Sequence, residues 1–192
     1  CSLRVVEQPN RGQTEALNTG IRVANGEVVL FLDDDLVCDK ALVREHAAAH
    51  TLGIPQIVFG RMHVAGDSPD VLAAKSMSAS LHKYFARLDN DKKPKWPYDA
   101  WVGPNCSIPR SVLLELGGYD QTLFPKRYED VDLGLRLWKR GIPFKYHPSA
   151  VTHHVCAKPK HSISSDITYD GEALIRLCKK HPDYRPYAGV AE

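Results

Sequence analysis

Residues 27–35 read Glu-Val-Val-Leu-Phe-Leu-Asp-Asp-Asp, an apolar, β-rich run that ends in three adjacent aspartates. A strand that is apolar along its length is typical of a parallel sheet covered on both faces, so we expect residues 27–32 in the middle of such a sheet. In an open α/β sheet, ligands bind in the crevice beyond the carboxyl ends of the strands. Asp33, Asp34 and Asp35 therefore stand where a ligand site is expected.

The three aspartates predict a cation site, because adjacent carboxylates repel one another unless a cation lies among them. Asp33 and Asp35 can point to the same side of an extended segment, which makes a D-x-D pair suited to one Mg²⁺ or Mn²⁺ ion. Such an ion usually also binds the oxygens of a diphosphate. The alternative is a turn whose acids cap the next helix, and these residues alone leave both interpretations open.

Further acids and histidines follow later in the chain. Glu129 and Asp130 stand at a predicted helix start, where the helix dipole stabilises acids and where one carboxylate could equally act as a general base. His153 and His154 end a predicted strand. Lone histidines are more often surface or core residues, but a neutral imidazole near a D-x-D pair can bind Mn²⁺. Strand alternation puts His154 on the face of Thr152 and His153 with core-directed valines, so we expect His154 nearer the metal.

Strands and helices alternate along the chain, which predicts an α/β fold with a mainly parallel sheet. The predicted strands span residues 2–7, 27–32, 57–64, 101–108 and 144–154, and the predicted helices span residues 15–24, 40–50, 71–88, 110–116, 130–140 and 170–181. We expect Thr14 to cap the first helix and Gly117-Gly118 to end the fourth. A polar loop is expected over residues 89–98.

Length and composition are those of an ordinary globular domain. The chain has 192 residues, of which 43% are hydrophobic and 25% charged, so it is long and apolar enough to form a core. The net charge of +2 is nearly balanced, and the only tight basic cluster (Lys92, Lys93, Lys95) is interpreted as a solvated loop. Nucleic-acid binding is therefore not predicted. No apolar run approaches the ~20 residues of a membrane-spanning helix.

The five cysteines are scattered and odd in number. They are Cys1, Cys38, Cys106, Cys156 and Cys178, and no two of them form a C-x-x-C pair. That pattern fits neither a disulfide framework nor a zinc site and is typical of a reducing compartment. We therefore expect a cytoplasmic protein, with peripheral association with a membrane as the alternative.

An ordered series of motifs resembles the family-2 glycosyltransferases with the GT-A fold. The motifs are Asn10-Arg11-Gly12, Ala24-Asn25-Gly26-Glu27, Phe31 to Asp35, Gly103 to Arg110, Gly117-Gly118-Tyr119-Asp120, Glu129 to Leu137, and His154. The D-x-D pair alone is a weak signal, whereas the ordered set is strong. The resemblance implies a Rossmann-like three-layer α/β domain over residues 1–192. In that domain, residues 1–60 would form the donor and metal side, and residues 61–192 the acceptor side and C-terminal helix.

The resemblance also implies roles for individual residues. The implied metal ligands, for Mn²⁺ or Mg²⁺, are Asp35, Asp33 and His154, with His153 as the fallback. The implied donor-binding residues are Asp34, Gly103, Asn105 and Ser107. Asp130 would be the general base and Glu129 its neighbour in the acceptor site.

The activity implied is transfer of one sugar from a nucleoside-diphosphate donor, with a UDP-sugar as the first choice, to an acceptor hydroxyl. The base deprotonates the hydroxyl as it attacks the anomeric carbon in line, which inverts that carbon, while the metal stabilises the leaving diphosphate. A processive synthase is not expected, because the chain lacks a Q-x-x-R-W segment. The alternatives are a non-catalytic module with this fold, or a metal-diphosphate enzyme such as a sugar nucleotidyltransferase.

The start of the chain adds one more expectation. Residues 2–7 read as an interior strand, and family members normally have strands before this point. We therefore expect either that residues precede Cys1 in the natural protein or that another chain covers the exposed edge, for instance in a homo-oligomer.

Overall fold

The fold is a sheet covered by helices, as the alternation of elements predicts. The structure, a computed structural model, describes residues 3–51, 53–91, 103–156 and 163–185. Its strands are β1 (Val28–Phe31), β2 (Leu36–Cys38), β3 (Ile57–Val64), β4 (Cys106–Pro109) and β5 (Phe144–His154). Its helices are α1 (Gln13–Val23), α2 (Leu42–Ala49), α3 (Val71–Asp91), α4 (Arg110–Glu115), α5 (Glu129–Lys139) and α6 (Ile163–Lys180), followed by the 3-10 turn η2 (Pro182–Tyr184).

The five described strands form one sheet in the order β1-β4-β3-β5-β2. Only β3 and β5 pair in parallel; β1 with β4, β3 with β4, and β2 with β5 pair antiparallel. The α/β class is thus confirmed, with a sheet that is mixed. The placement of β1 in the middle was wrong, because β1 is at an edge of the described sheet and Val28, Val29 and Leu30 are only half-buried. An apolar run therefore fixes neither the burial of its side chains nor the number of neighbouring strands.

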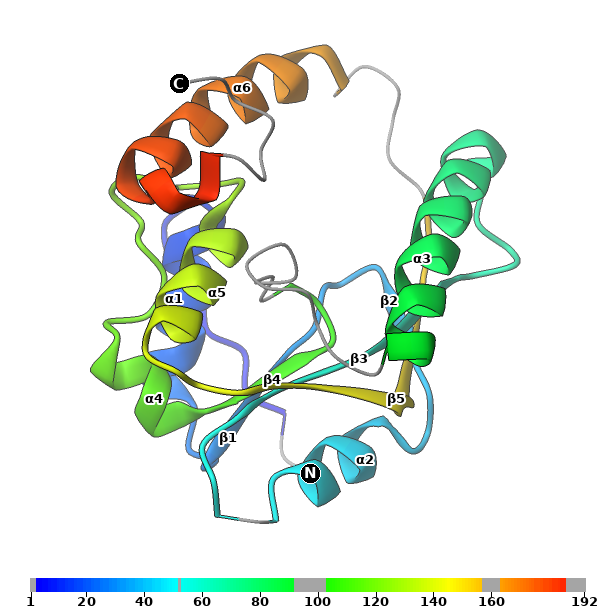
Figure 1. Cartoon of the computed structure of the whole chain (residues 1–192), viewed down its shortest axis with the longest axis horizontal. Helices are drawn as coiled ribbons and strands as arrows, with labels where there is room; N and C mark the ends of the chain where they lie inside the picture. Colours follow the sequence, from blue (N-terminus) through cyan, green and yellow to red (C-terminus); the bar gives the residue numbers. More distant parts are fainter. Residues whose placement is uncertain (1–2, 52, 92–102, 157–162, 186–192) are drawn as a thin grey trace.

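Helices lie on both sides of the sheet (Figure 1). Helix α2 lies on one face, whereas α3 and α5 lie on the other, and α6 runs beside α5. The main core forms between the sheet and these helices. It contains Ile21, Phe31, Ile57, Phe59, Met62, Phe85, Leu88, Cys106, Ile108, Val112, Leu113, Tyr119, Leu133 and Leu137. Burial of each large side chain contributes about 1.5–3 kcal/mol, so this core is the principal source of stability.

One glycine in β3 allows a close approach between strands. A Cβ atom at Gly60 would overlap the carbonyl oxygen of Ala150 and the side-chain amide of Asn105. Beside it the β3–β5 register shifts between Gly60, which pairs with His147, and Arg61, which pairs with Val151. The glycine and the β-bulge therefore let the side chain of Asn105, directly before β4, reach across β3 to Ala150 in β5.

Several local predictions need correction. The predicted strand at residues 2–7 is absent from the described residues 3–7, where Leu3 is 93% and Val5 75% exposed. A β-rich run becomes a strand only where a neighbour supplies hydrogen bonds, and no strand of the described part of the chain pairs with it. Thr14 does not cap α1, which begins at Gln13; its hydroxyl donates to the Phe124 carbonyl at 2.5 Å.

The remaining boundaries differ by smaller amounts. Helix α3 continues to Asp91, and α6 begins at Ile163 rather than near residue 170. Strand β4 begins at Cys106, and residues 101–102 lie outside the described part of the chain, as do residues 92–98 of the predicted loop and its lysines. The Gly117-Gly118 stop is confirmed, with φ of 76° and 72° directly after α4. Within the described residues, no helix combines the length and apolar character needed to cross a bilayer.

Candidate active site

The three aspartates occupy the short turn between β1 and β2. The turn is fixed at both ends by backbone hydrogen bonds, because Asn105 N donates to Phe31 O (2.9 Å) and Val155 N donates to Asp35 O (2.8 Å). Leu36, the next residue, pairs with His154 across the β2–β5 ladder. The turn therefore lies beside the end of β5, although more than a hundred residues separate them in sequence.

His154 faces this turn and His153 does not. The Nε2 atom of His154 lies 3.3 Å from Asp35 Oδ2. The ring of His153 lies beside that of His63, with centroids 5.6 Å apart. The choice of His154 over its neighbour agrees with this geometry, but one reason for it was wrong. The fully buried residue in this part of β5 is Thr152, and Val151 is only half-buried.

Asp35 and His154 form a two-residue candidate metal site. Asp35 Oδ1 is buried and has no hydrogen-bond partner among the described residues. No group of three or more histidine, cysteine, aspartate or glutamate side chains is arranged as a metal site in the described part of the chain. Mg²⁺ and Mn²⁺ are often held by one or two protein ligands, with phosphate and water oxygens completing the shell, so this pair fits such an ion.

Asp33 is exposed, and its negative charge acts on Glu129 and on Tyr119. Burial is the main cause that raises the pKa of Glu129 and of Tyr119, and the negative charge of Asp33 raises both further. Within the described residues, Asp33 does not join Asp35 and His154 in a group of three candidate metal ligands. Asp34 is exposed.

Glu129 and Asp130 begin α5 after two residues in the left-handed region, Arg127 (φ 61°) and Tyr128 (φ 60°). Such positions cost about 1–3 kcal/mol each and tend to occur at functional sites. Glu129 is 7% exposed, and its Oε2 atom has no hydrogen-bond partner among the described residues. Burial, then the neighbouring Asp130 charge, raises the pKa of Glu129 to about 7. Asp130 is half-buried, and its Oδ1 accepts a hydrogen bond from Val131 N (2.7 Å).

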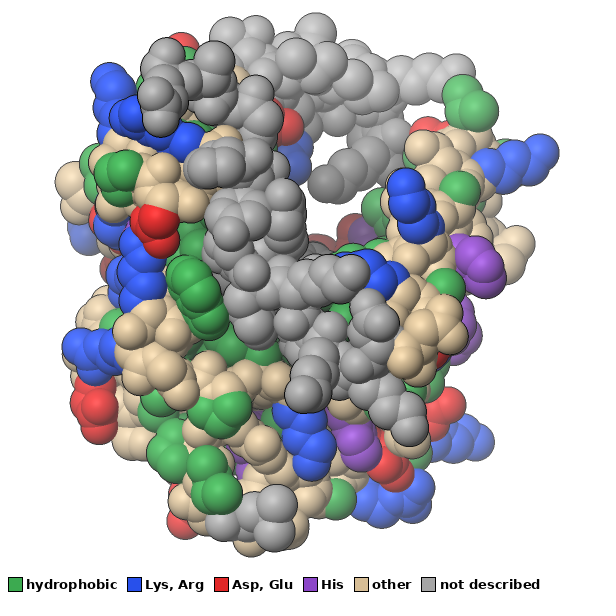
Figure 2. Space-filling model, viewed as in Figure 1, with side chains coloured by type: hydrophobic (Ala, Val, Ile, Leu, Met, Phe, Trp, Pro, Cys, Tyr) green, Lys and Arg blue, Asp and Glu red, His purple; other side chains and the backbone are tan. Residues whose placement is uncertain are grey.

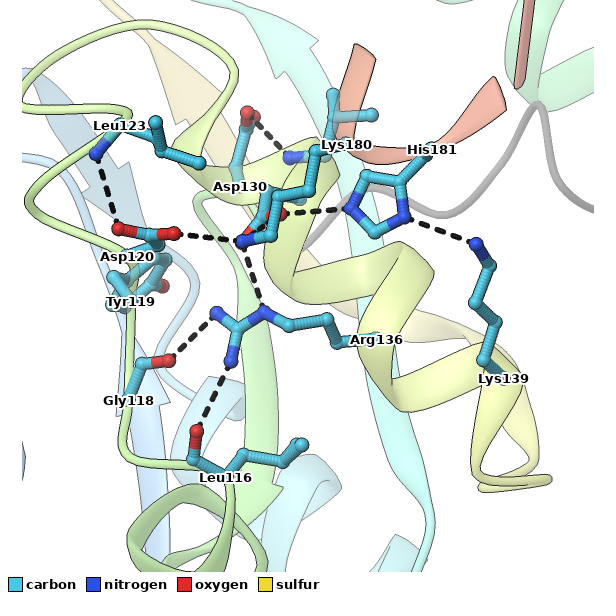
Figure 3. A network of polar contacts seen from close by, with 12 residues as sticks. Leu116, Gly118, Tyr119, Asp120, Leu123, Asp130, Arg136, Lys139, Lys180 and His181 are labelled. Carbon is cyan, nitrogen blue, oxygen red and sulfur yellow. Dashed lines mark hydrogen bonds and ion pairs between the residues drawn. The ribbon is translucent and has the colours of Figure 1, made fainter. Parts of the chain in front are cut away.

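A second buried carboxylate on α5, Asp132, is fully neutralised. It is 0% exposed and accepts from Arg136 Nε (2.8 Å) and His181 Nε2 (2.8 Å), while Lys180 Nζ lies 2.7 Å from its Oδ1. Lys180 also donates to Asp120 at 2.8 Å (Figure 3). These contacts hold the C-terminal end of α6 against α5.

The same network reaches the chain before α5. Arg136 donates to the carbonyls of Leu116 (3.1 Å) and Gly118 (2.7 Å), as Figure 3 shows. The next residue, Tyr119, packs edge-on against Phe31 with ring centroids 5.7 Å apart. Helix α5 is therefore tied, through Arg136 and the segment that ends in Tyr119, to the end of β1, from which the aspartate turn begins.

Asn105 and Ser107 were predicted to bind the donor. Their side chains instead lie in the interior, at 1% and 0% exposure, and do not line an open pocket. His46 on α2 connects them, with Nε2 2.8 Å from Asn105 Oδ1 and Nδ1 2.7 Å from Ser107 Oγ. Asn105 Nδ2 donates to the carbonyls of Arg61 (3.0 Å) and Ala150 (2.9 Å). Burial lowers the pKa of His46, which favours its neutral form. These residues hold the sheet under the aspartate turn, and the half-buried Gly103 precedes them.

A cavity of about 180 Å³ lies between β3 and α3. Its floor is apolar, and its polar lining comprises Arg61, His63, Ser78, His82 and Asp89. Histidine side chains are visible on this side of the molecule, at the right of Figure 2. Val64, also in the lining, pairs with His154, so the cavity borders the candidate metal site.

The structure thus holds an acid–histidine pair, Asp35 with His154, and an acid pair, Glu129 with Asp130, and the charge of Asp33 acts on Glu129. This fold and its acidic strand end define the class of GT-A glycosyltransferases. The chain belongs to glycosyl transferase family 2, whose sequence profile matches residues 1–117.

Relatives and solved structures agree with that assignment. The chain is 28% identical to a pre-mycofactocin glycosyltransferase of Mycobacterium tuberculosis, over 95% of this chain and 38% of the relative. It is 27% identical to galactofuranosyltransferase GlfT2 of the same species, over 91% of this chain and 30% of the relative. The mannosyltransferase PcManGT from Pyrobaculum calidifontis, solved with GDP-Man and Mn²⁺, has the same fold at a TM-score of 0.55 and 17% identity, over 95% of this chain and 49% of that one. The chain spans well under half the length of the first of these relatives.

Sequence reasoning missed part of the site's support. The spacing of Asp132 and Arg136, four residues apart on one helix, is a signal that could have indicated an ion pair. Nothing in the sequence indicated that Lys180 and His181 would join it.

Proposed function

We propose that this chain transfers one sugar from a nucleoside-diphosphate donor to an acceptor hydroxyl, with inversion at the anomeric carbon. The observation that carries the proposal is that the chain has two unlike pairs, an aspartate with a histidine after β1 and two adjacent acids at the start of α5. Asp35, with a buried unpartnered oxygen, lies beside His154, and the Glu129–Asp130 pair begins α5. The first pair can bind a cation that in turn binds the diphosphate. The second pair can accept a proton from the acceptor hydroxyl.

Asp35 and His154 would hold a divalent ion, Mn²⁺ or Mg²⁺. When bound, the ion neutralises charge on the leaving diphosphate, so no protein acid is needed there. Asp33 and the exposed Asp34 are assigned to the donor's ribose and phosphates. The GDP-Man and Mn²⁺ bound by PcManGT support a sugar nucleotide as donor, with a UDP-sugar as the first to test.

Asp130 is assigned as the general base. It takes the proton of the acceptor hydroxyl as the new oxygen–carbon bond forms and the bond to the diphosphate oxygen breaks. Glu129, with a pKa of about 7, is half-protonated near neutral pH and can donate or accept a hydrogen bond to a substrate hydroxyl. Because the two acids share one environment, the pH profile belongs to the pair.

Residues 1–60 would then serve the donor and metal, and residues 61–192 the acceptor. The cavity between β3 and α3 falls in the second part, next to His154. Its mixture of hydrogen-bond donors and acceptors suits a polar, hydroxyl-bearing acceptor better than a bare apolar one.

The metal role is tested with the Asp35→Ala variant. Thermal unfolding is followed with UDP or GDP, with and without Mn²⁺, because a ligand that binds only the native state raises the apparent stability. The unchanged chain should gain stability from nucleotide and Mn²⁺ together, and the variant should lose the Mn²⁺-dependent part. An undiminished Mn²⁺ effect in the variant would remove Asp35 from the site.

The catalytic role is tested with Asp130→Asn. Transfer, or hydrolysis of the sugar nucleotide, should fall by about 10²–10⁴-fold, because the variant cannot accept the proton. Donor binding measured by calorimetry should stay nearly unchanged. A wild-type chain that binds the sugar nucleotide but never cleaves it would favour a non-catalytic binding module instead.

A further inference from the structure

Cys156 contacts the candidate metal ligand His154 from the side opposite Asp35. Its Sγ atom lies 3.6 Å from His154 Nδ1, while the other ring nitrogen, Nε2, lies 3.3 Å from Asp35 Oδ2. The imidazole thus bridges a carboxylate and a thiol. A thiol is a weak hydrogen-bond partner, but it can either donate or accept.

The position of this thiol is fixed by the loop that follows β3. Cys156 is 3% exposed. Its backbone N donates to Ser68 Oγ (3.1 Å), and its carbonyl accepts from Asp70 N (2.9 Å). The Sγ atom has a second neighbour, Met77 Sδ on α3, at 3.8 Å. The thiol hydrogen therefore has two acceptors to choose between: a ring nitrogen and a thioether.

A neutral imidazole carries one N–H, and a nitrogen that binds a metal must give up its hydrogen. Without a metal, an Nε2–H facing the Asp35 carboxylate is electrostatically favoured, which leaves Nδ1 of His154 as an acceptor. With a metal on Nε2, the hydrogen must be on Nδ1. His154 therefore needs a partner that can donate in the first state and accept in the second.

We propose that Cys156 is this partner, a positioning residue that fixes the His154 ring in both tautomers. In the metal-free state the thiol donates to Nδ1. In the metal-bound state Nδ1–H donates to Sγ, and the thiol hydrogen turns to Met77 Sδ. One proton would leave Nε2 and one would arrive at Nδ1 through solvent, so the exchange is balanced. The metal-bound half rests on the proposed function.

A thiol partner affects how strongly His154 is held in one tautomer. Metal-binding histidines usually donate their second N–H to a carboxylate or a carbonyl, which holds one tautomer. Neither of those groups can donate back. A thiol supports both tautomers weakly, so His154 can join and leave a metal without losing its partner.

The first test needs no metal. In ¹⁵N-histidine NMR spectra of the whole chain, assigned with His154→Gln, the metal-free protein should show His154 protonated on Nε2. Cys156→Val should move the Nδ1 signal towards that of a ring nitrogen with no hydrogen bond, and Cys156→Ser should restore it. A metal-free His154 protonated on Nδ1, or an Nδ1 signal that Cys156→Val leaves unchanged, would overturn the proposal.

The second test uses Mn²⁺ with UDP, followed by calorimetry. Loss of such an outer partner typically lowers metal affinity by about 10–100-fold, and a weak thiol partner predicts the lower end for Cys156→Val. Cys156→Ser should keep most of the affinity, and Cys178→Val, which removes a buried thiol from α6, should keep all of it. Equal affinity in Cys156→Val would overturn the metal-bound half.

The two proposals can fail separately. If the wild-type chain binds no Mn²⁺ with UDP or with GDP, the metal role fails, and the metal-free spectra still decide whether Cys156 positions the ring. If Cys156→Val does not fold, Cys156→Ala replaces it in both experiments.

Discussion

Glu129 and Asp132 are two buried carboxylates on the same helix, one turn apart, and their surroundings are opposite. Burial raises the pKa of Asp132, but the hydrogen bonds from His181 and Lys180 and the charge of Arg136 outweigh it, so the pKa is lowered. Burial and the Asp130 charge raise the pKa of Glu129 to about 7. Burial raises the pKa of both acids, so the difference between them comes from the neighbouring charges and hydrogen bonds.

The comparison also separates two roles. Every cation around Asp132 comes from the chain itself, so this acid is complete without a ligand and holds α6 to α5. Glu129 keeps a buried oxygen that accepts no hydrogen bond from any described residue, at a cost in stability. Such a cost is expected where a substrate supplies the missing partner.

The largest effect is expected for Asp132→Asn. The substitution leaves Arg136 without its carboxylate partner and Lys180 with Asp120 alone. Breaking a buried pair in this way costs about 3–5 kcal/mol. Urea unfolding at pH 7 measures the change. Asp183→Asn, which weakens an ion pair with 48% of the acid side chain exposed, is the matched control. A loss below about 1 kcal/mol in Asp132→Asn would mean that the network is not structural.

A smaller effect of opposite sign is expected for Glu129→Gln. The folded pKa of about 7 exceeds the usual 4.5, so the stability that this acid contributes is fully present below pH 4.5 and is lost as the pH rises through 7. A neutral glutamine avoids that loss. At pH 8 the variant should therefore be more stable than the wild type by up to about 3 kcal/mol, relative to the difference at pH 4.

Urea unfolding at the two pH values tests this, with the exposed Glu115→Gln as the control. A difference between wild type and Glu129→Gln that does not grow with pH would show that Glu129 is an ordinary acid.

The smallest effect is expected at the outer end of the network. Lys139 donates to His181 Nδ1 (3.1 Å) and to Asp183 (2.8 Å), and its side chain is 39% exposed. Exposed pairs contribute about 0.2–1 kcal/mol, so Lys139→Met should change the free energy of unfolding by no more than that. The effect should shrink further in 1 M salt, which screens exposed charges. A loss as large as that of Asp132→Asn would extend the essential network to the surface.

The sequence predicted best what depends on local pattern. The bounds of β3 and β5 match residue for residue. The start of α5 was one residue off. The family and its fold could be predicted because the motifs occur in a fixed order.

Features that depend on distant partners could not be predicted. His181 meets Asp132 across 49 residues, and His46 meets Asn105 across 59. Neither contact leaves a periodic signal, which is why Asn105 and Ser107 were assigned to a donor pocket rather than to the interior. The strand predicted at residues 2–7 was wrong for the same reason, because a strand forms only where a neighbouring strand supplies hydrogen bonds.

The hydrogen bonds of Asn105 require an amide nitrogen that donates, and this has a consequence for chemical damage by deamidation. Its amide nitrogen donates to two carbonyls, and its oxygen faces His46 Nε2. Deamidation to aspartate would put a carboxylate oxygen against the carbonyls of Arg61 and Ala150, with no hydrogen left to donate. In the folded chain the side chain is 1% exposed and held by its partners, so hydrolysis has little access to it. A chain deamidated at Asn105 before folding could not complete the contact between β3, β4 and β5. We therefore expect such a chain to fail to fold, rather than to fold and lack activity.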